Sequence, residues 1–266
     1  MPELPDVEIF RRYLDATSLH QSIERVRAEV DVLRDISVRR FEKTLKGKSF
    51  EGTRRHGKYA FVSLGEAPWL LLHFGMTGFL KYYKNNEKAP SHVRVLFTFQ
   101  NGYHLAYSCQ RKLGRVKLVD EPARFVRSQG LGPDALDPDL GADAFKQAIK
   151  GFGGSVKSAL MNQQLIAGIG NIYSDEILYQ AGIFPKQPVA QMDEKILDRL
   201  YEAVKEVLMT AIDVQADPEQ LPDTYIIPWR HGEGRCPRDG SPIERLKVSG
   251  RSSYYCPQCQ SSGRQT

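Results

Sequence analysis

The sequence predicts an α+β protein with a β-rich N-terminal half, a helical C-terminal half and a short cysteine-bearing tail. In the first half, short apolar runs alternate with stretches rich in Gly, Asn and Pro, as strands alternate with turns. From Ala142 onward, apolar residues recur at every third or fourth position, which is the helical period. Three of the four cysteines lie in the last 31 residues, which indicates a metal site in a reducing compartment rather than disulfides.

The N-terminal half, residues 1–129, is expected to form one domain. It opens with a helix, because apolar residues recur at helical spacing from Val7 to Leu14 and acidic residues occupy the first turns. Residues 23–30 alternate as in a strand, and Ser37 is a typical N-cap for a short helix. Five further runs with strand character predict a sandwich or a barrel: Tyr59–Leu64, Trp69–Phe74, Val93–Phe99, Tyr103–Tyr107 and Arg115–Val119.

A hinge is expected to join this half to a helical domain. Residues 130–141 are rich in Gly and Pro, which is linker composition, and residues 142–228 carry the helical period. Residues 229–266 form a basic tail that contains the three clustered cysteines. Four helices are expected, at Ala142–Lys150, Ser155–Asn162, Asn171–Ala181 and Asp193–Val214.

Composition and charge narrow the function. No run of 18 apolar residues exists, and the N-terminus lacks the pattern of a secretory signal, so we expect a cytoplasmic protein with no membrane partner. The net charge is only +5, but residues 34–58 hold nine basic and three acidic side chains, and residues 228–266 hold seven and three. Such clustering favours a nucleic-acid partner. A solvated basic surface is the alternative.

The tail has the spacing of a zinc ribbon. Cys236 and Asp239 form one short turn, and Cys256 and Cys259 form a second turn after sixteen intervening residues. Each turn of such a hairpin supplies two ligands to one tetrahedral ion. Both thiolate sulfur and carboxylate oxygen are zinc ligands in proteins. We therefore expect one zinc ion per chain. A metal-free hairpin is the alternative, since Asp239 stands where a fourth cysteine would be usual.

Two glycines and the N-terminus are candidates for chemistry. Gly168 and Gly170 precede a helix that starts at Asn171, and amides at such a turn can bind phosphate. A simple helical hairpin would have the same pattern. Removal of Met1 would leave Pro2 as a secondary amine, which is partly unprotonated and nucleophilic near neutral pH.

Five segments together resemble the bacterial formamidopyrimidine-DNA glycosylase and endonuclease VIII family of base-excision repair enzymes. They are residues 2–8, 54–59, 73–78, 163–173 and the finger from Cys236 to Cys259. The resemblance covers nearly the whole chain. It implies an N-terminal two-layer β-sandwich, a hinge, a helix–two-turn–helix domain and a β-hairpin zinc finger.

The resemblance also implies roles for individual residues. Pro2 would be the nucleophile that attacks C1′ of the damaged nucleotide, Glu3 the acid/base, and Lys58 the lysine beside the phosphate of the lesion. Side chains that fill the gap left by the flipped base would be Met76, Arg111 and Leu113. Contacts to the DNA backbone would come from His73, Lys157, Asn171 and Arg251.

The implied function is a bifunctional DNA glycosylase and abasic-site lyase that acts as a monomer on double-stranded DNA containing a damaged base or abasic site, and associates with the nucleoid when bound. Met76 and Arg111 favour oxidised purines. Residues 215–235 lack the loop that caps 8-oxoguanine in the formamidopyrimidine branch, and Leu113 replaces a Phe, so oxidised pyrimidines are an alternative. Lyase activity alone, or a lesion-binding zinc-ribbon protein without catalysis, are further alternatives.

Overall fold

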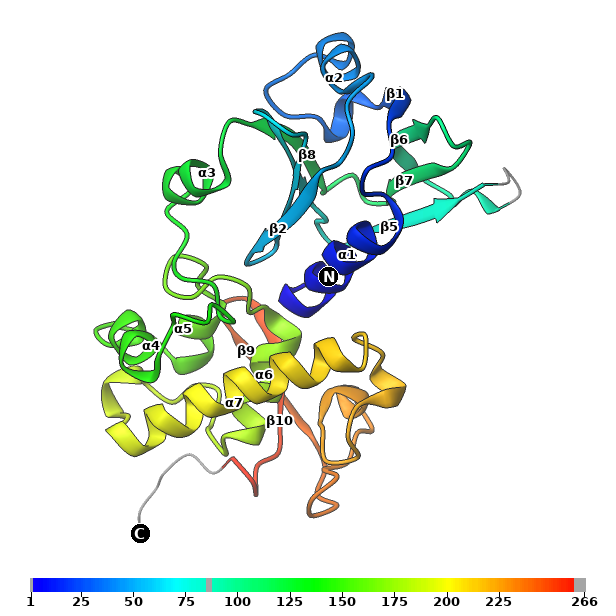
Figure 1. The fold of residues 1–266 in the computed structure, drawn as a ribbon. Coiled ribbons are helices and arrows are strands. Elements are labelled where there is room, and N and C mark those ends of the chain that lie inside the picture. The colour runs from blue at the N-terminus through cyan, green and yellow to red at the C-terminus, as the bar shows by residue number, and fades with distance from the viewer. Residues whose placement is uncertain (1, 85–87, 261–266) are drawn as a thin grey trace. The chain divides into compact units, whose positions relative to one another are not determined.

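The computed structural model describes residues 2–84 and 88–260 (Figure 1). The chain divides into two compact units. The first comprises residues 1–2 and 6–130, and the second comprises residues 3–5 and 131–266. The three residues that follow Pro2 therefore belong with the C-terminal half. No helix among the described residues is long and apolar enough to span a membrane.

The first unit contains two four-stranded antiparallel sheets, with strand orders β1-β6-β7-β5 and β2-β3-β4-β8. This confirms the β-sandwich. Its elements are α1 (Leu4–Thr17), β1 (Ile23–Ala28), α2 (Val38–Leu45), β2 (Gly52–His56), β3 (Tyr59–Ser63), β4 (Trp69–His73), β5 (Gly78–Tyr83), β6 (Val93–Phe99), β7 (His104–Cys109), β8 (Arg115–Val119) and α3 (Pro122–Ser128).

Apolar side chains from both sheets form one core, to which α1 and α2 contribute. Phe41 of α2, Leu72 of β4 and Phe97 of β6 are all fully buried or nearly so in this cluster. The N-cap at Ser37 is confirmed, since its hydroxyl accepts the N–H of Arg40 at 3.3 Å. These contacts explain why α2 stays helical although it is only eight residues long.

Three elements of this unit were not predicted. Strand β2 is largely polar and only partly buried, because it lies at the edge of its sheet, so its sequence lacks a clear apolar alternation. Strand β5 is also an edge strand, and α3 is a single short helix that begins with Pro122. The expected strand 23–30 ends earlier, at Ala28, and a 3-10 turn follows at Val30–Val32.

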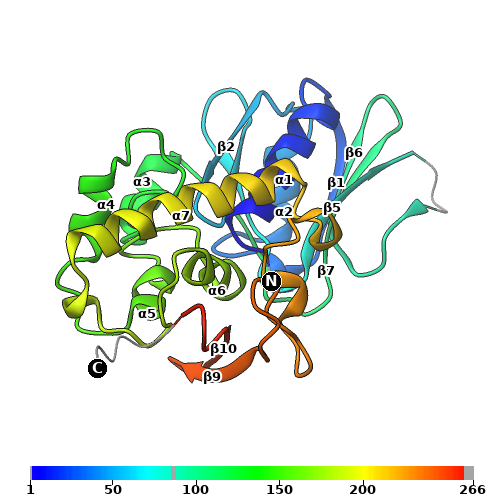
Figure 2. The same ribbon diagram turned by 90° about the horizontal axis from the view of Figure 1, so that it is seen from below.

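The second unit is helical and carries the hairpin (Figure 2). Its core gathers apolar side chains from all four helices, including Phe145, Leu160, Ile177 and Leu200. Helix α6 also packs along strand β10 of the hairpin. The elements are α4 (Ala142–Ile149), α5 (Val156–Met161), α6 (Asn171–Gln180), α7 (Glu194–Asp213), β9 (Glu244–Val248) and β10 (Arg251–Tyr255).

Candidate functional site

The first turn of α6 binds the carboxylate of Glu3. Glu3 is 1% exposed, and its Oε2 accepts the N–H groups of Gly170 at 2.8 Å and Tyr173 at 3.2 Å. Its Oε1 accepts the N–H of Ile172 at 2.9 Å. The first amides of a helix have no partners within the helix and face the positive end of its dipole, so they favour an anion. The anion is here a carboxylate of the chain, and not the phosphate that the glycine turn suggested.

Two glycines allow this close approach. A Cβ on Gly170 would overlap the carboxylate of Glu3, and a Cβ on Gly168 would overlap the side chain of Leu4. The N–H of Leu4 also donates to the carbonyl of Gly168 at 3.1 Å. Glu3 and Leu4 are therefore fixed against the start of α6. Pro2, which is half-buried, directly precedes it. Met1, whose removal we expect, lies outside the described residues.

Lys58 lies in the turn between β2 and β3, and His73 lies at the end of β4 in the same sheet. Lys58 is half-buried and follows Gly57, whose φ of +53° allows the tight turn between β2 and β3. His73 ends β4 opposite Tyr59, with ring centroids 5.0 Å apart. Burial lowers the pKa of His73 to about 4, and the positive charge of Arg115 acts in the same direction. His73 is thus neutral at pH 7, and its predicted contact with the DNA backbone would be a hydrogen bond without a charge.

Met76, Arg111 and Leu113 lie on two loops that touch each other. Gly75 approaches the backbone of Leu113 so closely that a Cβ on this glycine would overlap it. The hydroxyl of Thr77 accepts the N–H of Arg111 at 3.1 Å. Met76 is 39% exposed and Leu113 48% exposed. The structure therefore brings together the three residues that were predicted to fill the gap in the duplex, and leaves their side chains accessible.

Asp175 on α6 is the centre of a buried polar cluster. It accepts the Ser253 hydroxyl at 2.7 Å and the N–H of Tyr254 at 3.1 Å, both on β10. Arg230 donates to it through Nε at 3.1 Å and Nη2 at 2.8 Å. The ammonium of Lys157 also donates to it, and both Lys157 and Asp175 have no exposed surface. Lys157 thus neutralises a carboxylate of the chain, and its contact with the DNA backbone stays a prediction.

Asn171 and Arg251 flank the point where the hairpin meets the helices. Nδ2 of Asn171 donates to the carbonyl of Ser252 at 3.0 Å, while its buried Oδ1 has no hydrogen-bond partner in the described part of the chain. Arg251 begins β10 and is exposed. The hydroxyls of Ser158 and Ser249 lie 2.8 Å apart, which fixes the hairpin turn to α5. Arg251 is therefore displayed from a backbone that is anchored on both sides.

Cys236, Asp239, Cys256 and Cys259 form a cluster whose ligand atoms all lie within 4.8 Å of one another. The Sγ atoms of Cys236 and Cys259 are 3.7 Å apart. Oδ2 of Asp239 is 3.3 Å from the Sγ of Cys256 and 3.2 Å from that of Cys259. Thiolates about 2.3 Å from a tetrahedral zinc ion are separated by about 3.8 Å, so the cluster fits one zinc ion.

The cluster places an ionised carboxylate beside thiols whose pKa is raised. Hydrogen bonds from Ser241 hold the pKa of Asp239 well below its usual range. The backbone N–H of Ser241 donates to Oδ1 of Asp239 at 2.8 Å. Burial raises the pKa of Cys259 and of Cys256. A zinc ion would offset that burial and hold both cysteines as thiolates.

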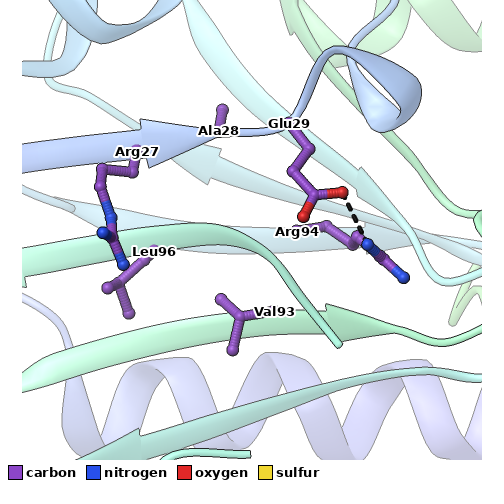
Figure 3. A pocket seen from close by; sticks show the side chains of 6 residues that line it. All are labelled: Arg27, Ala28, Glu29, Val93, Arg94 and Leu96. Carbon is purple, nitrogen blue, oxygen red and sulfur yellow. Dashed lines mark hydrogen bonds and ion pairs between the residues drawn. The ribbon is translucent and has the colours of Figure 1, made fainter. Parts of the chain in front are cut away.

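Two surface hollows of the first unit lie away from the predicted site residues. One, of about 350 Å³, adjoins the ion pair between Arg94 Nη1 and Glu29 Oε2, which are 2.6 Å apart (Figure 3). The other, of about 370 Å³, includes Arg40 and Asp120. Neither is lined by a residue that the sequence singled out. The first is lined by Arg27, Ala28, Glu29, Val93, Arg94 and Leu96.

Sequence reasoning missed the residues that support the site. Asp175 and Arg230 form a forked ion pair across 55 residues of chain, and no local pattern announces it. One signal was available: Asn171, Asp175 and Tyr179 are four residues apart, so these polar groups share one face of the helix. That face is the one that meets the finger, since the hydroxyl of Tyr179 lies 3.2 Å from the Sγ of Cys236.

Comparison with known families accounts for nearly the whole chain. Residues 1–116 match the formamidopyrimidine-DNA glycosylase N-terminal domain, and residues 131–222 match the formamidopyrimidine-DNA glycosylase H2TH domain. Residues 234–261 match a zinc finger found in formamidopyrimidine-DNA glycosylase and isoleucyl-tRNA synthetase. All three matches follow the order of the segments described above.

Individual relatives agree with these matches. A formamidopyrimidine-DNA glycosylase of Pelotomaculum thermopropionicum is 33% identical over 273 residues, which cover 98% of this chain and 99% of the relative. One of Geobacter metallireducens is 31% identical, with 98% and 100% covered. The Lactococcus lactis enzyme bound to DNA with an abasic site has a TM-score of 0.87 at 28% identity, covering 97% of this chain and 99% of that one. The complex of the same enzyme with DNA containing a formamidopyrimidine lesion has a TM-score of 0.88 at 28% identity, covering 97% of this chain and 100% of that one.

Proposed function

The chain belongs to the formamidopyrimidine-DNA glycosylase family and is a DNA glycosylase, and on this premise we propose that it excises oxidised bases from duplex DNA and then cleaves the abasic site. The observation that carries the proposal is the fixed N-terminus. Three amides at the start of α6, including that of its N-cap Gly170, hold the carboxylate of Glu3, and Pro2 is bonded directly to Glu3. Glu3 is therefore positioned for chemistry without further ordering of the chain, and Pro2 is adjacent to it.

The proposed reaction begins with the amine of Pro2. Its nitrogen attacks C1′ of the damaged nucleotide, and the base leaves with the electron pair of the glycosidic bond and takes up the proton that the nitrogen loses. Glu3 protonates the ring oxygen as the sugar opens, which leaves an iminium between Pro2 and C1′. The nucleophile and the acid are adjacent in the chain, so both would reach one sugar.

The iminium then allows strand cleavage. It acts as an electron sink, so a proton is lost from C2′ and the 3′ phosphate leaves with the electron pair of its C–O bond. A second elimination releases the 5′ phosphate. Lys58, Asn171 and Arg251 would bind the phosphates and stabilise the charge that develops on them. Water finally hydrolyses the iminium and frees the amine of Pro2. We propose that residues 1–129 supply Pro2 and Lys58, while residues 142–228 and 229–266 supply Asn171 and Arg251.

Oxidised purines are the proposed first choice of substrate. Met76 and Leu113 are exposed on adjacent loops, where they could wedge into the gap left by a flipped base, and Arg111 could face the edge of the orphan base. Oxidised pyrimidines are the second candidate, because residues 215–235 are short and carry no long capping loop. The chain is proposed to act as a monomer.

A panel of duplexes, each with a single lesion, tests this function. We expect release of formamidopyrimidine and 8-oxoguanine bases, and covalent trapping on abasic DNA by borohydride. Pro2→Gly should weaken trapping strongly, and one extra residue before Pro2 should abolish it, because the secondary amine becomes an amide. The same extra residue at the C-terminus is the control. Incision without release of any base would leave a lyase alone, and binding without either activity would leave a lesion-binding protein.

A further inference from the structure

Residues 110–114, here called the Arg111 loop, connect β7 to β8 and so lead from one sheet of the first unit to the other. The loop carries Arg111 and Leu113, which were predicted to fill the gap in the duplex. Between them lies Lys112, whose φ of +53° is in the left-handed region. A lysine rarely adopts this conformation, which persists where neighbouring groups hold the backbone in place. The contacts of the loop therefore show what fixes it.

Two acidic residues that follow β1 hold the Arg111 loop at two points. Oδ2 of Asp31 accepts a hydrogen bond from the ammonium of Lys112 at 2.5 Å, and both side chains are about half exposed. Oε2 of Glu29 accepts one from Nη1 of Arg94 at 2.6 Å (Figure 3). Nε of Arg94 donates in turn to the carbonyl of Cys109, the last residue before the loop, at 2.9 Å. Asp31 thus holds the middle of the loop, and Glu29 holds its beginning through an arginine.

The segment that carries these acids is itself fixed to β8, the strand that follows the loop. Leu33 is buried in the core of the first unit, and the N–H of Arg34 donates to the carbonyl of Val116 at 3.2 Å. Asp35 forms a second ion pair, with Lys117 on the same strand, at 2.5 Å. The two acids therefore extend from a backbone that is already ordered, and an ion pair made from such a backbone orients its partner at little further cost in entropy.

We propose that Asp31 and Glu29 are positioning residues that hold the Arg111 loop ready to enter the duplex, and so set the discrimination between bases opposite the lesion. This inference rests on the proposed function. Arg111 can face the orphan base only when the loop fills the gap left by the flipped base, and a loop that is already ordered loses less entropy on entry. Phosphates repel carboxylates, so Asp31 and Glu29 act through the loop and not by contact with DNA.

Asp31→Asn tests the contact in the middle of the loop. The measurement is kcat/KM for excision of a formamidopyrimidine base opposite each of the four bases. The ratio between the best and the worst opposite base should fall by about 2- to 5-fold, the range for losing one half-exposed ion pair. Binding to undamaged duplex should not weaken, because the substitution removes a negative charge.

Asp35→Asn is the matched control for this test. It breaks an ion pair of the same length on the same segment, but its lysine lies on β8 and not in the loop. The ratio should therefore stay at the wild-type value. A wild type that does not discriminate between opposite bases, or an equal ratio in Asp31→Asn and the wild type, would overturn the inference.

A charge swap separates positioning from direct binding of phosphate by Lys112. Combining Asp31→Lys with Lys112→Asp restores the pair with its charges exchanged, and aspartate tolerates the left-handed backbone. The double variant should regain most of the discrimination that Lys112→Asp loses alone. A double variant as impaired as Lys112→Asp would show that Lys112 acts on the DNA itself, and would overturn the inference.

Hydrogen exchange reports the order of the loop without any reaction. The N–H of Arg111 donates to the hydroxyl of Thr77, so its exchange measures local opening of the loop. Exchange should be faster in Asp31→Asn and in Glu29→Gln than in the wild type, and unchanged in Asp35→Asn. Equal exchange in all four proteins would overturn the inference. A wild type that excises no base would instead overturn the proposed function, whatever the exchange shows.

Discussion

Two aspartates support the same hairpin in opposite ways. Asp175 contacts β10 next to Arg251, is fully buried, and is neutralised by Lys157 and Arg230 of the chain itself. Asp239 lies at the other end of the hairpin, is exposed, and faces three cysteines. A buried carboxylate with its own cations needs nothing from solution, whereas thiols grouped around an exposed carboxylate form a stable site only with a metal ion.

The hairpin thus has a helix-side support, formed by Asp175 with its partners, and a metal-side support, formed by Asp239 with the three cysteines. The helix-side support should persist without zinc, because every contact of Asp175 is made within the chain. The metal-side support should fail when zinc is removed. Arg251 is close in sequence to the first support, so its position should depend more on Asp175 than on the metal. Each of the following experiments tests one side of this comparison.

Asp175→Asn should have the largest effect. The substitution leaves Lys157 and Arg230 without a counter-charge, and breaking a buried pair in this way usually costs about 3–5 kcal/mol of unfolding free energy. Thermal or urea unfolding measures the loss. Asp198→Asn is the matched control, because Asp198 pairs with Lys146 on the surface and is 52% exposed, where such a pair contributes about 0–1 kcal/mol. Similar losses for both variants would show that the buried cluster adds no special stability.

Glu176, the fully buried acidic residue next to Asp175 on α6, should make stability depend on pH. Burial raises its pKa from 4.5 to about 7. Between these values the unfolded chain has released the proton and the folded chain has kept it, so stability should fall as pH rises from about 4.5 to 7 and then level off. The full change is about 3 kcal/mol, from 1.36 kcal/mol per pKa unit.

The measurement is the unfolding free energy between pH 4.5 and 8. Glu176→Gln should remove most of the decline, since the amide stays neutral throughout. Glu194→Gln, on the exposed start of α7, should leave the decline in place. If the wild-type and Glu176→Gln curves run parallel, Glu176 is ionised in the folded protein at both ends of the range.

The comparison also shows what a sequence can and cannot predict here. The metal ligands were found because Cys236 and Asp239, like Cys256 and Cys259, are near neighbours in sequence with a recognisable spacing. The role of Asp175 was not found, because its partners come from three distant segments. The resemblance, and not a local pattern, gave Lys157 a contact with the DNA backbone; the structure places its ammonium against Asp175, with no exposed side-chain surface. The fold class followed from periodicity, while the polar edge strand β2 escaped it.

Asp239→Ala should have a smaller effect on folding than Asp175→Asn but should strip the metal. We expect about one zinc per chain in the wild type and a value near zero in the variant after dialysis against a chelator. Asp239→Cys should hold zinc more tightly, because thiolate is a softer ligand than carboxylate. Elemental analysis and DNA affinity are the measurements. Wild-type protein that is fully active and contains no zinc would contradict the metal-side support.

The smallest effect is expected in the salt dependence of DNA binding, and it distinguishes exposed from buried cations. Each phosphate contact adds about 0.9 to the slope of log affinity against log salt. Arg251→Ala should lower the slope by about that amount, because Arg251 is exposed at the hairpin turn. Lys157→Met should leave it unchanged, because Lys157 is buried against Asp175. Both variants must first show normal zinc content and remain folded under the conditions of the binding assay. A slope that falls equally in Lys157→Met would mean that DNA binding separates Lys157 from Asp175 and turns a structural ion pair into a phosphate contact.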